Sequence, residues 1–335
     1  MVEAAGVGPS SEPPMNGMPL FSVVIPTHGR PQDLQQAVAS VLAQTMTNFE
    51  IIVVDDAGEP PAPAVSDARV RTIRLAVNGG EGAARNVGIR EARGSWVAFL
   101  DDDDLWYPQR LERISDALRA NPSWQKDVIT TDVEVWRGGE RSSLYSEERP
   151  FHREDQLKAM LRRPFITSMI AAPRSLLLDI GGYDESLLVG EDADLLYRLL
   201  CRGVRVHLVP EALARYNKGS GVTADRLRLW SGKLHVIDKL IASGTLDSRT
   251  LAVAEEVRAQ TEARMHVSCI ALERSTQQLE RRTLFAAARC GGLPRRQRLA
   301  YLVAGLSPRA VMAWDRRRRT ARRRMSKHAD RGRCP

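Results

Sequence analysis

Short apolar runs alternate with helical patterns along the first two thirds of the chain. The apolar runs predict strands at 21–25, 49–54, 70–75, 95–100, 127–137, 167–173 and 204–209. Apolar residues at helical spacing predict helices at 33–44, 83–92, 108–120 and 193–202, and a further helix that ends at Gly181-Gly182. Strands and helices in this alternation are typical of a parallel sheet covered on both faces. The pattern therefore predicts an α/β fold.

The two ends of the chain differ from this alternating region. The first 18 residues are rich in Gly, Pro, Ser and Glu without periodicity, which predicts a disordered leader. From about residue 224 the pattern is helical, with breaks near Gly244 and at Gly291-Gly292. We therefore expect four parts: a leader at 1–18, an α/β domain at 19–223, a helical region at 224–308 and a basic tail at 309–335.

The positive charge of the chain is concentrated near its end. The whole chain has a formal net charge of +8. Residues 309–335 contain eleven Lys and Arg against Asp315 and Asp330, a net charge of +9, so the preceding residues sum to −1. A nucleic-acid function argued from the charge of the whole chain is therefore excluded, because the excess belongs to the tail alone.

Composition and cysteine spacing narrow the class of protein. A chain of 335 residues with 43% hydrophobic and 27% charged residues is ordinary for a globular protein. No apolar run approaches the roughly 20 residues of a spanning helix, and the N-terminus has neither a basic region nor an apolar core for export. The four cysteines lack the paired short spacing of a zinc or redox motif. We therefore expect a cytoplasmic protein with reduced thiols.

Acidic clusters follow two of the predicted strands. Asp55-Asp56 comes directly after the strand at 49–54, and the run Asp101 to Asp104 comes directly after the strand at 95–100. Ligands of open α/β sheets bind beyond the carboxyl ends of the strands. Adjacent carboxylates repel one another unless a cation or hydrogen-bond donors compensate, and Mg²⁺ and Mn²⁺ prefer oxygen ligands. A divalent metal held for a phosphate substrate is the economical explanation.

Other motifs have a structural interpretation beside a functional one. A third acidic cluster, Gly190-Glu191-Asp192, opens a helix, where an acid is also a helix-capping residue. Asn78-Gly79-Gly80 is a turn signal, and residues 80–85 form an imperfect dinucleotide fingerprint with Arg85 in place of the third Gly. His28 and Arg30 follow the first strand, where surface-loop residues are equally expected. On the residues alone these alternatives stay open.

Taken together, the motifs resemble a family-2 glycosyltransferase of the GT-A fold. The resemblance rests on VVIPTHGR, SVLAQT, FEIIVVDD, NGGEGAARNVGI, GSWVAFLDDDDLWYPQRL and IGGYDESLLVGEDADLLYRL, which occur in the family's order and spacing. It covers about residues 20–220. It implies a Rossmann-like, mostly parallel sheet, a nucleoside-diphosphate sugar as donor and a hydroxyl acceptor that the sequence does not identify.

The resemblance implies roles for individual residues on the donor side. It places the nucleotide base and ribose against Pro26, Thr27 and His28, with Asp56 on the base and Asp55 beside it. Asp102 is implied to lie near the ribose. Asp101 and Asp103 match the metal motif for Mg²⁺ or Mn²⁺, with Asp103 as the direct ligand. The other nucleotide-sugar candidates are Arg30, Asn78, Arg85, Glu191 and Lys218.

The acceptor side of the resemblance depends on Asp192. This residue matches the general base that deprotonates the acceptor hydroxyl, so that one displacement inverts the anomeric carbon. The chain departs from the family at Gly29, where Asn is frequent, and at 57–59, where a different turn is usual. Many members have His or Arg after the last strand. Here Lys218 is the substitute candidate.

Other classes explain less of the sequence. A metal-dependent nucleotidyltransferase would also use strand-end carboxylates, but it gives Glu191-Asp192 no function. A non-catalytic binding protein with a basic tail accounts for 309–335 and for nothing else. A dinucleotide oxidoreductase is disfavoured because the imperfect fingerprint follows the third strand and four consecutive acids come after it.

The C-terminal third has its own expectations. The helical region is expected to cover the far edge of the sheet, to shape the acceptor side or to form a homodimer, and the sequence leaves these three alternatives open. The tail combines Val311, Met312 and Trp314 with dense Arg, which predicts peripheral contact with the inner face of the membrane. A solvated charged segment is the alternative, and nucleic acid is disfavoured as a partner.

Overall fold

The structure, a computed structural model, describes residues 17–165, 168–218, 226–276, 281–291 and 293–306. The chain divides into two compact units, residues 1–219 and residues 220–335. This division lies close to the boundary expected after residue 223. The first 16 residues of the leader and the whole of the predicted basic tail lie outside the described residues.

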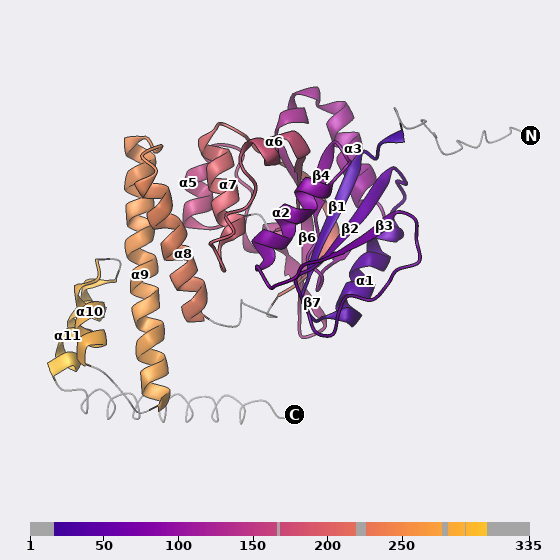
Figure 1. Cartoon of the computed structure of the whole chain (residues 1–335). Helices are drawn as coiled ribbons and strands as arrows, with labels where there is room; N and C mark the ends of the chain where they lie inside the picture. The colour runs from indigo at the N-terminus through magenta and orange to yellow at the C-terminus, as the bar shows by residue number, and fades with distance from the viewer. Residues whose placement is uncertain (1–16, 166–167, 219–225, 277–280, 292, 307–335) are drawn as a thin grey trace, which may run out of the picture. The chain divides into compact units, whose positions relative to one another are not determined.

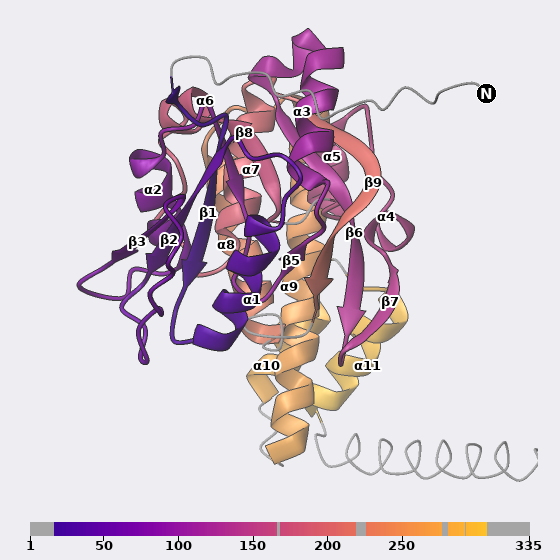
Figure 2. The same cartoon turned by 90° about the vertical axis from the view of Figure 1, so that its right-hand side faces the viewer.

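The strands of the first unit form one nine-stranded sheet. The strands are β1 (Phe21–Thr27), β2 (Phe49–Asp55), β3 (Val70–Arg74), β4 (Trp96–Phe99), β5 (Leu105–Trp106), β6 (Val128–Arg137), β7 (Glu140–Leu144), β8 (Ile170–Pro173) and β9 (Val206–Asn217). Their order is β3-β2-β1-β4-β8-β6-β9-β5, and β7 pairs with β6. Figures 1 and 2 show β3, β2 and β1 side by side at one side of the sheet.

Most neighbouring strands on one side of the sheet are parallel, and the antiparallel strands are β5, β7 and β8. The pairs β3–β2, β2–β1, β1–β4 and β6–β9 are parallel. In contrast, β8 is antiparallel to both β4 and β6, and β5 and β7 are antiparallel to β9 and β6. The sheet is therefore mixed, with most strands in one direction, which confirms the mostly parallel sheet that the resemblance implied. An apolar run carries no direction, because direction depends on the edge at which the preceding segment delivers the chain.

Helices of the first unit pack on both faces of this sheet. They are α1 (Pro31–Leu42), α2 (Glu81–Glu91), α3 (Arg110–Ala120), α4 (Tyr145–Glu148), α5 (Gln156–Arg162), α6 (Arg174–Asp179) and α7 (Glu191–Cys201). Side chains of β1 alternate between the faces. Val23 belongs to the cluster that includes Leu34 and Val38 of α1, whereas Val24 contacts Gly88 of α2. The apolar run at 21–25 is continuous because both faces of β1 are buried.

Close packing of α2 on β1 predicts a cost for any side chain at residue 88. A Cβ atom added at Gly88 would lie 2.3 Å from Cγ1 and 2.7 Å from Cγ2 of Val24. Valine has few alternative rotamers, so Gly88→Ala should lower the free energy of unfolding by about 1–3 kcal/mol despite the better helix propensity of Ala. Urea denaturation measures this change.

The matched control for this prediction removes the obstacle. Val24→Ala alone leaves a cavity, and combining it with Gly88→Ala lets the new methyl group occupy part of that space. The double variant should therefore be more stable than the sum of the single changes predicts. A Gly88→Ala protein as stable as the wild type would contradict this close approach of α2 to β1.

The second unit is helical in its described part. Its helices are α8 (Arg226–Ala242), α9 (Ser248–Thr276), α10 (Arg281–Arg289) and α11 (Arg295–Leu306). The expected breaks lie at Gly244, which separates α8 from α9, and at the segment that contains Gly291, between α10 and α11. Buried Ile270, Leu284 and Ala287 form a small core in this unit. Among the described helices, none is long and apolar enough to span a membrane.

Candidate active site

The ends of β1, β2 and β4 meet at one edge of the sheet. Thr27, the last residue of β1, is the register partner of Asp55, the last residue of β2. The Thr27 hydroxyl donates to Oδ2 of Asp102, 2.7 Å away, in the loop after β4. Arg30 follows β1 and pairs with Oδ1 of Asp102 at 3.0 Å. The structure thus brings the residues after three separate strands into one set of contacts, which also includes the backbone of buried Pro26.

The two acids at the end of β2 hold neighbouring loops. Asp55 accepts hydrogen bonds from the backbone N–H groups of Gly58 at 2.8 Å and Ala62 at 3.0 Å. It also pairs with Arg74 at 2.7 Å, and its side chain is 2% exposed. Because both oxygens of Asp55 are engaged, its contribution in this structure is to shape the loop beside the site.

Asp56 holds the turn that precedes α2. Its two carboxylate oxygens accept hydrogen bonds from the backbone N–H groups of Gly79 at 2.7 Å and Gly80 at 2.8 Å. Nδ1 of His28 lies 2.7 Å from the Asp56 carbonyl oxygen, which assigns the proton to Nδ1. The side-chain nitrogen of Asn78 lies 3.4 Å from His28 Nε2. His28 and Asn78, expected on the nucleotide, therefore lie side by side at this turn.

The four consecutive acids after β4 point to different partners. Asp101 accepts from Arg85 at 2.8 Å through Oδ1 and from the Ser168 hydroxyl at 2.5 Å through Oδ2. Asp103 lies 3.4 Å from Arg30 and its side chain is 23% exposed. Repulsion within the run is therefore reduced by donors from several elements.

Asp104 is turned into the protein. One of its oxygens accepts from the backbone N–H of Asn217 at 2.7 Å, and the other is buried without a hydrogen-bond partner. The Asn217 side chain donates to the backbone carbonyl oxygen of Asp103. The end of β9 is thus bound to the acidic loop on both sides. Sequence reasoning missed Asn217, although it is adjacent to the candidate Lys218.

Burial and neighbouring charges shift the pKa values of these carboxylates in different directions. Burial raises the pKa of Asp102 to about 7, against the opposing effects of Arg30 and Thr27. Burial also raises the pKa of Asp104 well above its usual range, and Asp101 adds to the effect. At Asp101 burial works in the same direction, but Arg85 and Ser168 outweigh it and lower the pKa. Asp101 is therefore held ionised by its partners.

The third acidic cluster begins α7. Gly190 precedes the helix with φ at 89°, a left-handed conformation that favours glycine, and α7 has no side-chain cap hydrogen bond. The helix-cap alternative for Asp192 is therefore not observed. Asp192 is 34% exposed in its side chain, whereas Glu191 is 9% exposed.

Arg85 joins this cluster to the acidic loop after β4. Its side chain is fully buried, with Glu191 at 2.9 Å and Asp192 at 3.4 Å, and Asp101 on the other guanidinium nitrogen. Glu81 lies one helical turn earlier, at 3.1 Å. Four carboxylates therefore surround one guanidinium group, and we define these five residues as the Arg85 cluster.

In this structure Arg85 contacts protein carboxylates of the acidic loop and of α7. Arg85 was expected on the nucleotide sugar, but a fully buried guanidinium holds protein carboxylates in this structure. Burial raises the pKa of Asp192 well above its usual range; Arg85 opposes this, and Glu191 and Asp101 add to it.

The side chain of Lys218 forms an ion pair with Glu148, which belongs neither to the acidic loop after β4 nor to the Arg85 cluster. Its ammonium group pairs with Glu148 at 2.8 Å, in a group that also includes Arg137 and Ser143. Its backbone N–H donates to the Trp136 carbonyl oxygen at 2.9 Å. A contact between Lys218 and a diphosphate therefore stays a prediction, and it would require the ion pair with Glu148 to open.

The arrangement of the acidic side chains shows how well they could hold a divalent metal. In the described part of the chain, no group of three or more His, Cys, Asp or Glu side chains is arranged to hold a metal ion. Mg²⁺ often takes only one or two protein carboxylates and completes its shell with substrate phosphates and water. The side chains of Asp101 and Asp103 are similarly exposed, at 25% and 23%. Both oxygens of Asp101 accept short hydrogen bonds, so Asp103 fits that role better.

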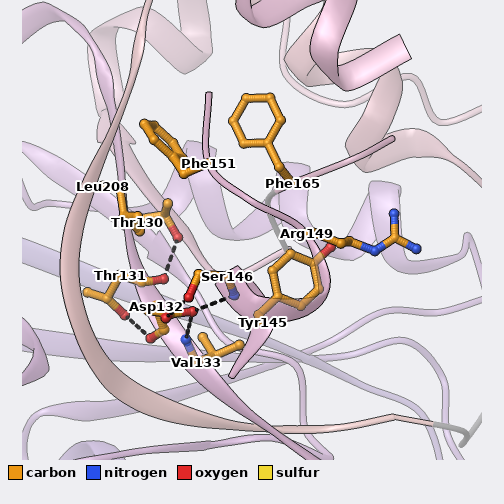
Figure 3. A pocket seen from close by; sticks show the side chains of 10 residues that line it. All are labelled: Thr130, Thr131, Asp132, Val133, Tyr145, Ser146, Arg149, Phe151, Phe165 and Leu208. Carbon is orange, nitrogen blue, oxygen red and sulfur yellow. Dashed lines mark hydrogen bonds between the residues drawn. The ribbon is translucent and has the colours of Figure 1, made fainter. Parts of the chain in front are cut away.

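A separate small pocket lies on β6 beside α4, and Figure 3 shows the side chains that line it. Its polar side is Asp132, which accepts from the Ser146 backbone N–H at 3.1 Å and from its hydroxyl at 2.5 Å. Its apolar side includes Phe151 and Phe165, with ring centroids 5.1 Å apart. None of the strand-end acids lines this pocket. Because Asp132 is engaged within the protein, we assign the pocket no part in the chemistry.

Comparison with solved structures identifies the fold. The chain resembles residues 1–349 of TarS from S. aureus in complex with UDP-GlcNAc, with a TM-score of 0.56 and 18% identity, over 83% of this chain and 82% of that chain. The same TarS segment in complex with UDP gives a TM-score of 0.53. Together with the mixed sheet and the acidic edge, this likeness defines the first unit as a glycosyltransferase-type GT-A fold.

Sequence comparison then identifies the family. The model of glycosyl transferase family 2 matches residues 22–181. An uncharacterized glycosyltransferase of Rickettsia typhi is 31% identical over 241 residues, which are 66% of this chain and 73% of the relative. The chain belongs to glycosyltransferase family 2.

In two further relatives, the region that matches this chain is only part of the relative's own length. Succinoglycan biosynthesis protein ExoO of Rhizobium meliloti is 30% identical over 65% of this chain and 66% of its own length. An uncharacterized glycosyltransferase of Haemophilus influenzae is 30% identical over 54% of this chain and 62% of its own length. The chain thus matches less than two thirds of each of these relatives.

Proposed function

We propose that this protein is an inverting glycosyltransferase that moves a sugar from a nucleoside-diphosphate sugar to an acceptor hydroxyl. The observation that carries the proposal is the Arg85 cluster. It holds Asp101 of the donor-side loop and Glu191-Asp192 of the acceptor-side helix on a single buried guanidinium. Two motifs about 90 residues apart in sequence therefore share one fixed geometry, which positioning two substrates requires.

On the donor side, residues after β1 and β4 would hold the nucleotide. Thr27 and Arg30 fix both oxygens of Asp102, so this carboxylate is oriented before any substrate binds. Asp56 and the turn at Gly79-Gly80 hold His28 beside the same edge. A uridine nucleotide is the first donor to test, because the TarS structures contain UDP and UDP-GlcNAc.

A divalent metal would be held by Asp103 together with the donor diphosphate. When bound, Mg²⁺ or Mn²⁺ supplies Lewis-acid stabilisation of the negative charge on the leaving phosphate. Arg30 lies between Asp102 and Asp103 and limits where the two carboxylates point. Asp101 would act as a positioning residue through Arg85 and Ser168.

On the acceptor side, Asp192 would accept the proton of the attacking hydroxyl. It is the more exposed member of the pair that opens α7, so an acceptor can reach it while Glu191 stays bound to Arg85. A base on the face opposite to the leaving group gives a single in-line displacement and inversion. The similarity to ExoO makes growing polysaccharides the first acceptor class to test.

The metal proposal predicts the effect of Asp103→Ala. Loss of the Asp103 carboxylate should abolish Mn²⁺-dependent donor binding and transfer, and leave the fold intact because this side chain is partly exposed. Nucleoside-diphosphate release from a panel of sugar nucleotides, with and without Mn²⁺, measures transfer. Asp116→Ala, in an exposed position of α3, is the matched control.

Two results would contradict the proposal at different points. Unchanged release of nucleoside diphosphate by Asp103→Ala would remove the metal assignment but leave the transferase. Release of inorganic pyrophosphate from a nucleoside triphosphate supplied with a sugar 1-phosphate, and no release of nucleoside diphosphate from the sugar nucleotides, would favour the nucleotidyltransferase alternative. The anomeric configuration of the product, determined by NMR, decides between inversion and retention.

A further inference from the structure

One face of α11 is apolar and uncovered in the second unit. Leu299 is 61% exposed and Leu302 is 45% exposed. Residues three and four positions apart share a face of a helix, so Arg295, Leu299 and Leu302 lie along one side of α11. Tyr301 packs on the small core formed by α9 and α10. The leucines therefore belong to the face that this core does not cover.

The charged residues in the sequence around this face are almost all positive. Residues 281–306 contain six arginines and no acidic residue. Over residues 281–335 there are seventeen Lys and Arg against two acids, a net charge of +15. The remaining 280 residues therefore have a net charge of −7. A strongly cationic segment with exposed leucines on one of its helices begins before the tail, at α10.

We propose that the exposed face of α11, together with the arginines of α10 and α11, binds the surface of an anionic lipid bilayer. Arginines attract anionic headgroups, and leucines on the same helical face enter the boundary between headgroups and acyl chains.

The same observations argue against two other occupants. A second copy would bring an identical cationic surface against this one, and like charges at a two-fold interface repel. Nucleic acid would be attracted by the arginines, but it gives two exposed leucines no apolar environment. This inference is independent of the proposed function, because none of its residues belongs to the acidic edge of the sheet.

The leucines provide the first test, on the full-length protein. We expect Leu299→Ser/Leu302→Ser to lower partitioning onto vesicles of equimolar phosphatidylglycerol and phosphatidylcholine by about tenfold or more. Vesicle cosedimentation measures this, and circular dichroism checks the fold. Leu178→Ser is the matched control, because Leu178 is 42% exposed in α6 of the other unit. Partitioning of the double variant equal to the wild type would overturn the proposal.

The arginines provide the second test. Arg295→Gln/Arg296→Gln should weaken partitioning by at least about fivefold and the effect should shrink at high salt. Arg113→Gln/Arg119→Gln, which changes two exposed side chains of α3, should bind like the wild type. Equal binding to pure phosphatidylcholine would overturn the electrostatic part. Tighter binding to duplex DNA that does not need the leucines, or a dimer that the leucine variant dissociates, would replace the bilayer by that partner.

Discussion

Asp192→Asn is expected to lower turnover by at least about a hundredfold while the affinity for the donor stays near that of the wild type. Asparagine preserves the shape of the side chain but accepts no proton from the acceptor hydroxyl. Glu191, which binds Arg85 directly, keeps the Arg85 cluster in place. Steady-state kinetics gives kcat, and calorimetric titration with the sugar nucleotide gives donor affinity.

The pH profile separates a base from a structural residue. Burial raises the pKa of Asp192, and only its ionised form accepts a proton. Wild-type kcat/KM should therefore rise with pH along a limb above the usual carboxylate range, and this limb should be absent from Asp192→Asn. Asp179→Asn, at a highly exposed residue of α6, is the matched control. Parallel loss of donor binding and turnover would make Asp192 structural.

Arg85→Met is expected to have the largest effect on stability. The substitution leaves Glu81, Asp101, Glu191 and Asp192 facing one another without their shared cation. Removing one side of a buried ion pair typically costs about 3–5 kcal/mol of the free energy of unfolding. Urea denaturation of Arg85→Met and of Arg90→Met, an exposed arginine of the same helix, measures the difference.

The loss of stability in Arg85→Met should depend on pH in a definite direction. Without Arg85 the clustered acids bind protons more readily in the folded state than in the unfolded state, so their folded pKa values are raised. Stability then falls as pH rises above the unfolded values and is partly restored as pH is lowered to about 4. A loss independent of pH would mean that Arg85 acts through packing alone.

Arg85→Lys tests the positioning role separately from the charge. Lysine keeps the positive charge, but its ammonium lacks the planar fork that contacts carboxylates on two nitrogens. We expect this variant to recover most of the stability and to keep donor affinity, with kcat lowered by at least about tenfold. Full activity of Arg85→Lys would show that the geometry of the cluster is not needed for transfer.

The acidic edge shows what residue patterns can and cannot predict. Continuous apolar runs predicted the central strands, and the acids after them had to lie at the strand ends because strand and loop are adjacent in sequence. The pattern did not predict how each acid is held within the protein. Asp55 pairs with Arg74, and Asp101 binds Arg85 and Ser168, whereas the contact of Asp103 with Arg30 is longer, at 3.4 Å.

By itself the sequence determined the α/β alternation, the strand-end position of the acids, the helical C-terminal third and the unequal distribution of charge. These follow from local periodicity and composition, which do not depend on the path of the chain. The tertiary structure alone decided the reversal of β8, the contact of Asn217 with the acidic loop and the burial of Arg85 among four carboxylates. Each of these joins residues far apart in sequence. Their partners are chosen by packing of the whole unit, because a buried charge is stable only where the fold brings opposite charges to it.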